Sequence, residues 1–146
     1  TNRYYIIRTS WLYGIQGKNF VETMLRLAKE KDKLKVINDQ TGSPTYAKDL
    51  AEATKQLLAK PFGIYHRTND QSCTWYEFAK EIFAQSNIDI QVDPCSTEEY
   101  PLPAKRPACS ILKNTKLESM RDWKSALSAY LKERSEKVDE AEEETQ

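Results

Sequence analysis

The sequence is poor in the residues from which the commonest catalytic motifs are built. It contains 4 glycines, 3 cysteines and a single histidine in 146 residues. No Walker-type phosphate loop, G-x-S-x-G turn or HExxH pair occurs, which excludes the enzyme classes that these motifs identify. A strand–GxGxxG–helix unit is also absent, so the chain has no dinucleotide pyrophosphate site of the usual kind.

The cysteines are widely spaced and odd in number. Cys73, Cys95 and Cys109 form no C-x-x-C pair, so neither a disulfide framework nor a metal site is expected. A cysteine nucleophile with His66 as its base is an alternative, but cysteine is more often a small buried residue. A reducing cytoplasm suits such a chain best.

The sequence also lacks an excess of charge and any long apolar run. Its 22 basic residues balance its 22 acidic residues, so no electrostatic argument favours nucleic acid or an anionic membrane as a partner. The apolar runs are far too short to span a bilayer. The overall composition is that of one globular domain.

The two ends of the chain differ in character. A strand-like segment starts within three residues of Thr1, which we interpret as a chain cut in mid-domain. The stretch 136–146 is rich in glutamate and almost free of apolar residues, so we expect a frayed, solvated tail. The expected organisation is one domain over 1–134 followed by an acidic flexible tail over 135–146.

Hydrophobic periodicity predicts alternating strands and helices, and hence an α/β fold with a partly parallel sheet. The expected strands are 4–8, 34–37, 63–67 and 88–92. The expected helices are 19–31, 46–60 with Thr45 as N-cap, one opened by a capping box of Thr74 and Glu77, 115–119 with Asn114 as N-cap, and 122–132. The segment 94–107 has four prolines and is expected to be an irregular loop that carries function.

Polar and aromatic residues gather where the predicted strands end. The clusters are 8–14, 39–45 and 68–74, with 103–107 in the long loop. Ligands of open α/β sheets bind at the carboxyl ends of strands, and this set suits a polar, phosphate-bearing ligand. Tyr76 and Lys80 have the spacing of a dehydrogenase proton-donor pair, but we interpret this as chance because they lie within a capped helix.

Several ordered motifs resemble one enzyme family. They are Ile7-Arg8-Thr9-Ser10-Trp11-Leu12-Tyr13-Gly14, Asn19-Phe20-Val21, Thr23-Met24-Leu25-Arg26-Leu27-Ala28, Asp39-Gln40-x-Gly42-x-Pro44-Thr45, Gly63-Ile64-Tyr65-His66, Cys73-Thr74-Trp75-Tyr76-Glu77-Phe78-Ala79 and Arg106-Pro107-x-x-Ser110. Together, from about residue 4 to 131, they resemble the dTDP-4-dehydrorhamnose reductases, which are extended short-chain dehydrogenases. Two features depart from the family pattern: Gln71 stands where glycine is usual, and the segment 117–123 is short.

The resemblance implies a fold, a reaction and a missing half. The fold would be a remnant of a Rossmann-like parallel sheet joined to the small substrate-binding subdomain. In the intact enzyme, NADPH or NADH would reduce the C4 carbonyl of dTDP-4-dehydrorhamnose while a tyrosine donates a proton. The cofactor loop and the catalytic Tyr/Lys pair would precede Thr1, so the chain alone should be inactive and bind no cofactor tightly. The amino-terminal Rossmann half is the expected partner, and the open strand 4–8 makes a homo-oligomer possible.

The resemblance also implies roles for individual residues, with no catalytic residue among them. The substrate-binding residues would be Trp11, beside the deoxysugar ring, Asn19, at the pyrophosphate, Phe20 and Gln40, lining the nucleotide pocket, and Arg106, on the diphosphate. Arg8, Thr9 and Ser10 would lie near the cofactor. Structural readings stand beside these roles: a core aromatic for Trp11, an N-cap for Asn19, a surface ion pair for Arg106, a packed side chain for His66, and core or pocket for Tyr13.

Two alternatives remain at this point. Another extended dehydrogenase acting on a nucleotide sugar would share the fold, although the Arg106-Pro107-x-x-Ser110 segment argues against it. A non-catalytic binding or regulatory protein is the second, since the regulatory subunit of methionine adenosyltransferase is similar to this family.

Overall fold

Short strands and helices alternate along the chain, as the α/β prediction requires. The computed structural model describes residues 2–101 and 103–143. The strands are β1 (Tyr5–Arg8), β2 (Leu12–Tyr13), β3 (Lys33–Ile37), β4 (Thr41–Gly42), β5 (Thr45–Tyr46), β6 (Gly63–His66), β7 (Cys73–Thr74) and β8 (Gln91–Cys95). The helices are α1 (Phe20–Glu30), α2 (Ala47–Leu57), α3 (Trp75–Gln85) and α4 (Trp123–Glu143).

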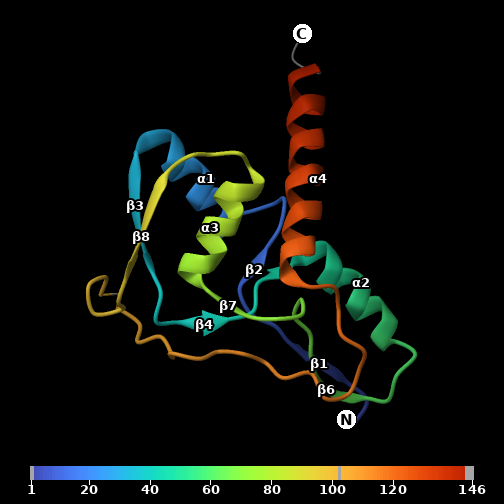
Figure 1. Cartoon of the computed structure of the whole chain (residues 1–146). Helices are drawn as coiled ribbons and strands as arrows, with labels where there is room; N and C mark the ends of the chain where they lie inside the picture. The colour runs from blue at the N-terminus through green and yellow to red at the C-terminus, as the bar shows by residue number, and fades with distance from the viewer. Residues whose placement is uncertain (1, 102, 144–146) are drawn as a thin grey trace.

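The strands form separate two-stranded pairs, most of them parallel. β1 pairs with β6, β2 with β5 and β3 with β8, all in parallel, whereas β4 and β7 are antiparallel. In Figure 1 the β1–β6 pair lies near the amino terminus, while β3 and β8 lie on the other side of α3 from α4. The parallel pairs confirm the predicted partly parallel sheet.

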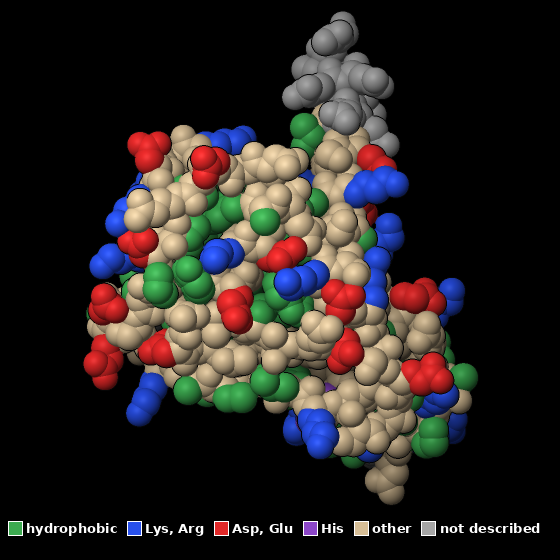
Figure 2. Space-filling view, in the orientation of Figure 1, with side chains coloured by type: hydrophobic (Ala, Val, Ile, Leu, Met, Phe, Trp, Pro, Cys, Tyr) green, Lys and Arg blue, Asp and Glu red, His purple; other side chains and the backbone are tan. Residues whose placement is uncertain are grey.

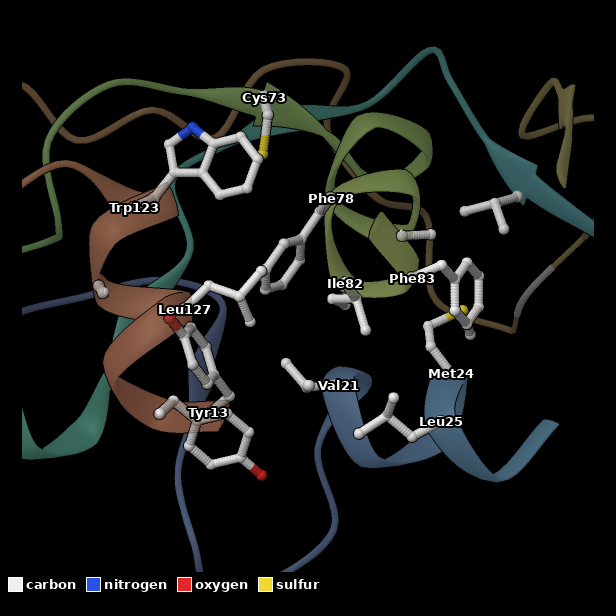
Figure 3. Packing of buried hydrophobic residues seen from close by; sticks show 14 of the residues in the cluster. Tyr13, Val21, Met24, Leu25, Cys73, Phe78, Ile82, Phe83, Trp123 and Leu127 are labelled. Atoms are coloured by element: carbon white, nitrogen blue, oxygen red, sulfur yellow. The ribbon is translucent and has the colours of Figure 1, made fainter. Parts of the chain in front are cut away.

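The core lies where α1, α3 and α4 meet. Each helix turns an apolar stripe inward, and Figure 3 shows Phe78 of α3 between Leu127 of α4 and Val21 of α1. The most deeply buried helical residues of this core are Val21, Phe78, Ala79, Ile82, Ala126, Leu127 and Tyr130. Burial of each large side chain contributes about 1.5–3 kcal/mol, so these contacts dominate the stability of the domain. The hydrophobic periodicity that predicted these three helices therefore corresponds to their buried faces.

The second helix is shorter than the prediction of 46–60. It runs over Ala47–Leu57, and Tyr46 precedes it without a side-chain cap. Thr45 does not cap it, because this residue is buried in β5 and its hydroxyl donates to Ser43 O at 3.5 Å. Leu58, within the predicted range but after the end of the helix, is 74% exposed. The helix therefore buries a shorter stretch than the sequence suggested.

The helix expected at 115–119 is absent from the structure. The side chain of Asn114 accepts from Leu117 N at 3.2 Å and donates to Leu117 O at 2.7 Å. The bond from Leu117 N is the one that an N-cap makes, but the bond to Leu117 O occupies a carbonyl that a continuing helix would need, and the segment is irregular. The last strand also starts and ends later than the predicted 88–92.

The last helix is longer than the prediction of 122–132. α4 continues to Glu143, so the acidic segment is helical up to that residue, and 144–146 lie outside the described residues. The segment has few apolar residues, but glutamate, alanine and lysine favour helix, and the ion pair Lys132–Glu136 spans one turn. The division at 134/135 and the flexibility of the tail stay predictions.

Candidate functional site

Two indole rings stack at the meeting point of two helix amino termini. The centroids of Trp11, in the β1–β2 connection, and Trp75, the first residue of α3, lie 3.5 Å apart with ring planes 11° from parallel. Phe20, the first residue of α1, has its ring centroid 4.6 Å from that of Trp75. All three are half-buried. We call Trp11, Phe20 and Trp75 the indole cluster.

The backbone holds Trp11 in a conformation that few non-glycine residues adopt. Its φ is +47°, in the left-handed region, which costs about 1–3 kcal/mol. Neighbouring bonds fix it there: Ser10 Oγ donates to Ser43 O at 2.9 Å, and Thr45 N donates to Trp11 O at 3.1 Å. Strain of this kind is concentrated at functional sites, which marks Trp11 as a candidate.

The long loop is bonded to β4 just after Arg106, and β4 adjoins the indole cluster. Thr41 of β4 donates its N–H to Ala108 O at 2.8 Å and accepts at its carbonyl from Ser110 N at 2.9 Å. The next residue, Gly42, lies directly against the ring of Trp11. Arg106 is exposed and has no hydrogen bond or ion pair within residues 2–101 and 103–143. Its guanidinium is thus available to a ligand, and the predicted surface ion pair is not seen in this part of the chain.

Asn19 is engaged in the structure of its own helix. Its Oδ1 accepts from Glu22 N at 3.0 Å, and its Nδ2 donates to Gly14 O at 2.9 Å. The N-cap reading is therefore confirmed. The Asn19 side chain also hydrogen-bonds to Tyr130 of α4, and contact with a pyrophosphate stays a prediction.

Gln40 is bonded to the start of the long loop that also carries Arg106. The side chain is buried and donates through Nε2 to Thr97 Oγ1 at 3.0 Å. Asp39 accepts from Thr97 N at 2.8 Å and from its hydroxyl at 2.6 Å, and these bonds lower the pKa of the Asp39 carboxyl. Both residues fix the start of the long loop, and the pocket-lining role of Gln40 stays a prediction.

The side chains of the three residues predicted to lie near the cofactor differ in their exposure and hydrogen bonding. Arg8, at the end of β1, is exposed, and the Ser10 hydroxyl is bonded to Ser43. Thr9 Oγ1 is buried and has no hydrogen-bond partner among the described residues. A buried unpaired hydroxyl costs about 1–3 kcal/mol, so this atom is the one most in need of a ligand.

Other chemically suggestive residues have structural roles. Tyr13 is buried, and its ring packs against Tyr46 and Tyr130, so the core reading holds for it. His66 Nδ1 lies 3.1 Å from Lys113 O, as a packed structural histidine would. Burial raises the pKa of the Cys73 thiol to about 12, which disfavours a thiolate nucleophile.

The pair Tyr76 and Lys80 lies on one helix face. Lys80 Nζ sits 5.4 Å from the centre of the Tyr76 ring, as a cation–π pair does one turn along α3. The contact follows from the spacing of the two residues on α3. The sequence contains no glycine-rich cofactor loop with which such a pair would act. The interpretation of their spacing as chance is therefore retained.

Two hollows of the surface lie outside the indole cluster. One, of about 890 Å³, lies between α2 and the segment 115–121 and is lined by Asp49, Arg67 and Arg121. The other, of about 500 Å³, lies beside Asn19 and the loop 12–16. Neither is lined by Trp11 or Arg106. The chemistry of the cluster, rather than the size of a hollow, makes it the candidate site.

The surface around these features mixes both signs of charge. Figure 2 shows Lys and Arg side chains interspersed with Asp and Glu over the face in view. Within the described residues, no three His, Cys, Asp or Glu side chains are grouped so as to hold a metal ion. No helix of the described part is long and apolar enough to cross a bilayer.

Two members of this site were missed by sequence reasoning. Trp75 and Gly42 each entered the sequence analysis only as one position of a family motif. The available signal was the position of Trp75 directly after the capping residue Thr74, where a side chain points past the end of the helix. The contact of Trp75 with Trp11, which is far away in the sequence, cannot be predicted from hydrophobic periodicity.

Comparison with known families gives one match that covers most of the chain. Residues 1–136 match the family described as RmlD substrate binding domain. The spore coat polysaccharide biosynthesis protein SpsK of Bacillus subtilis is 50% identical over 138 residues, covering 92% of this chain and 49% of its own. The chain thus spans about half the length of the relatives it matches.

Solved structures agree with this match. The dTDP-4-dehydrorhamnose reductase of Bacillus anthracis, in complex with NADP, superposes with a TM-score of 0.86 at 43% identity, over 90% of this chain and 49% of its own. The corresponding reductase of Clostridium acetobutylicum gives 0.84 at 47%, over 88% and 48%. A dTDP-glucose 4,6-dehydratase of B. anthracis reaches 0.70 at only 16% identity, which shows a common fold alone.

Proposed function

Because this chain belongs to the RmlD substrate binding domain family, we propose that it binds the sugar nucleotide in a reductase that converts dTDP-4-dehydrorhamnose to dTDP-L-rhamnose. The observation that carries the proposal is the contrast in identity between enzyme classes. Three solved dTDP-4-dehydrorhamnose reductases are 23%, 43% and 47% identical to the chain, whereas a dehydratase and an epimerase with the same fold are 16% and 17% identical. This contrast favours the reductase over another extended dehydrogenase.

The substrate would lie between the indole cluster and the loop of Arg106. The guanidinium has five N–H donors in a planar fork and no partner in the described structure, so it suits the diphosphate. The amino terminus of α1, which Asn19 caps, would add positive potential there. Trp11 would contact the sugar, with Phe20 and Gln40 nearer the base.

This chain would orient the substrate, and the reducing cofactor would be held elsewhere. NADPH or NADH, when bound, supplies the hydride for the C4 carbonyl. The chain has no GxGxxG unit to hold its pyrophosphate, and Thr9 Oγ1, buried and unpaired, is the group here that fits a contact at its edge. The chain on its own should therefore reduce no dTDP-4-dehydrorhamnose, and measurable turnover by these 146 residues would contradict this.

An exposed apolar face supports a second half of the enzyme as the partner. Ile6 of β1 pairs with Ile64 of β6, and their side chains are 46% and 37% exposed. Tyr4 and Phe62, just outside these strands, are also exposed. The matched relatives are about twice as long as this chain, so their other half is the occupant that we propose for this face. A second copy of the chain is the alternative, and light scattering at increasing concentration separates the two.

We also propose a cytoplasmic location. Its support is the chemistry of the cysteines: Cys73, Cys95 and Cys109 are all free thiols in the structure. Such thiols persist in a reducing compartment.

Calorimetric titration with nucleotide sugars tests the proposed function. We expect dTDP-L-rhamnose to bind and UDP-glucose to bind at least tenfold more weakly. A preference for UDP-glucose would favour another dehydrogenase of the same fold. Absence of binding by either would favour a non-catalytic homologue.

A further inference from the structure

Both faces of the Trp11 ring are already covered by the protein. Trp75 covers one face at a centroid distance of 3.5 Å. A Cβ placed on Gly42 would lie 2.4 Å from Trp11 Cε2, 2.6 Å from Cζ2 and 2.7 Å from Nε1. Because that position is closer to Cε2 than to Cζ2 and Nε1, which are bonded to Cε2 and lie at the rim, Gly42 lies over the ring rather than at its rim. The Trp75 indole is not among the nearest atoms there, so Gly42 covers the opposite face.

The rim of the ring keeps an unused hydrogen-bond donor. Trp11 Nε1 makes no hydrogen bond to any of the described residues. The buried polar atoms that lack a partner are those of Thr9, Tyr13, Arg67 and Ser86, and Trp11 Nε1 is not one of them. The half-buried indole therefore presents its N–H to solvent while its faces are closed.

We infer that Trp11 contacts its ligand through this rim, donating Nε1–H to an oxygen of the sugar nucleotide, and does not stack on the sugar with its ring face. Trp75 and Gly42 are then positioning residues, which hold the donor at a fixed angle by closing the indole between them. The inference rests on the proposed function and specifies how the same site contacts its ligand. It also explains why a strained φ of +47° is retained, since the backbone must turn the ring into this slot.

Indole ¹⁵N–¹H spectra of the protein test this contact directly. Three indole signals are expected, from Trp11, Trp75 and the buried Trp123, which serves as the internal control. On addition of dTDP-L-rhamnose, the Trp11 N–H should move downfield and exchange more slowly with water, and that of Trp123 should stay in place. Trp11→Phe, which keeps a ring but no donor, should weaken binding about five- to tenfold, as expected for one hydrogen bond.

Variants of Trp75 test the positioning role. Trp75→Phe keeps an aromatic cover and should keep most of the affinity for dTDP-L-rhamnose. Trp75→Ala should weaken binding about as much as Trp11→Phe does. Near-UV circular dichroism reports the stacked pair separately, because its coupled signal should vanish in Trp75→Phe even where the fold and the affinity survive.

The outcomes separate this inference from the proposed function. If dTDP-L-rhamnose binds without moving the Trp11 N–H, or if Trp11→Phe binds equally well, the rim contact is wrong and the proposed function stands. If the unaltered protein binds no dTDP-L-rhamnose, the proposed function fails first and the contact fails with it. Full affinity in a folded Trp75→Ala would remove Trp75 from the positioning role.

Discussion

The aromatic residues of the interior and those of the indole cluster are packed by different rules. Inside, Phe78 and Tyr130 are fully buried, and Phe78 meets Trp123 edge to face at 87°. At the cluster, Trp11 and Trp75 are half-buried and stacked face to face, on a backbone held at positive φ. The interior excludes its rings from solvent and stabilises the fold. The cluster retains strain and leaves donors without partners, as a binding site does.

Removal of an interior ring should have the largest effect on the protein. Phe78→Ala leaves a cavity at the centre of the core, where the native side chain is 0% exposed, and should lower the free energy of unfolding by about 3–5 kcal/mol. Urea unfolding followed by circular dichroism measures this. The same loss for Phe20→Ala, at the half-buried cluster, would erase the distinction between the two regions.

Filling the space beneath Trp11 should damage binding more than stability. Gly42→Ala places a Cβ 2.4 Å from Trp11 Cε2, so the ring must leave its slot. We expect at least a tenfold loss of affinity for dTDP-L-rhamnose in calorimetry, with about 1–3 kcal/mol lost from the free energy of unfolding. Gly17→Ala is the matched control, because its Cβ would meet nothing within 4 Å, although its positive φ adds a small strain of its own. Native affinity in Gly42→Ala would mean that the slot does not matter.

Removal of the unpaired guanidinium should affect binding alone. Arg106→Ala should weaken dTDP-L-rhamnose binding about tenfold, the scale of one charged hydrogen bond, and should leave the unfolding midpoint unchanged. Lys105→Ala, its exposed neighbour, controls for a general loss of positive charge. Equal effects of the two substitutions would reduce the role of Arg106 to nonspecific charge.

The smallest expected effect is a pH dependence of the free energy of unfolding. It arises where Glu22 of α1 contacts α4, at the interior rather than at the indole cluster. Burial raises the pKa of Glu22 in α1, but hydrogen bonds from Arg134 and Tyr130 of α4 outweigh it, so the folded pKa lies below 4.5. Since the pKa is lower in the folded state, this contribution to stability is present above about pH 4.5 and is lost as the pH falls through the folded pKa. Glu22→Gln should therefore lose less stability between pH 6 and pH 3 than the unaltered protein does.

Urea unfolding at several pH values measures this difference. The exposed Glu52 of α2 offers a control, since Glu52→Gln should follow the pH dependence of the unaltered protein. The same slope in Glu22→Gln and in the unaltered protein would show that the contact between α1 and α4 does not sense pH.

The sequence predicted those parts of the molecule that depend on neighbours along the chain. The capping box of Thr74 and Glu77 occurs as predicted, because both partners lie within one helical turn. The inward stripes of α1, α3 and α4 follow from helical spacing. The helix at 115–119 failed for a local reason as well: Asn114 can bond the same backbone groups without a helix.

The candidate site was predictable only in part. Trp11 and Arg106 were identified through a family resemblance, and β4 brings their segments together. The roles of Trp75 and Gly42 depend on contacts between distant segments, which neither periodicity nor spacing can show. Asn19 and Gln40 were named for ligand contacts, yet the structure uses their amides as an N-cap and a loop anchor.

The most direct test of the account is a structure of the protein with dTDP-L-rhamnose bound. In this complex the diphosphate should lie beside Arg106, and a ligand oxygen should lie at hydrogen-bond distance from Trp11 Nε1. Trp75 should still be stacked on the Trp11 ring. A ligand bound instead in the hollow between α2 and the segment 115–121, with the indole cluster untouched, would contradict it.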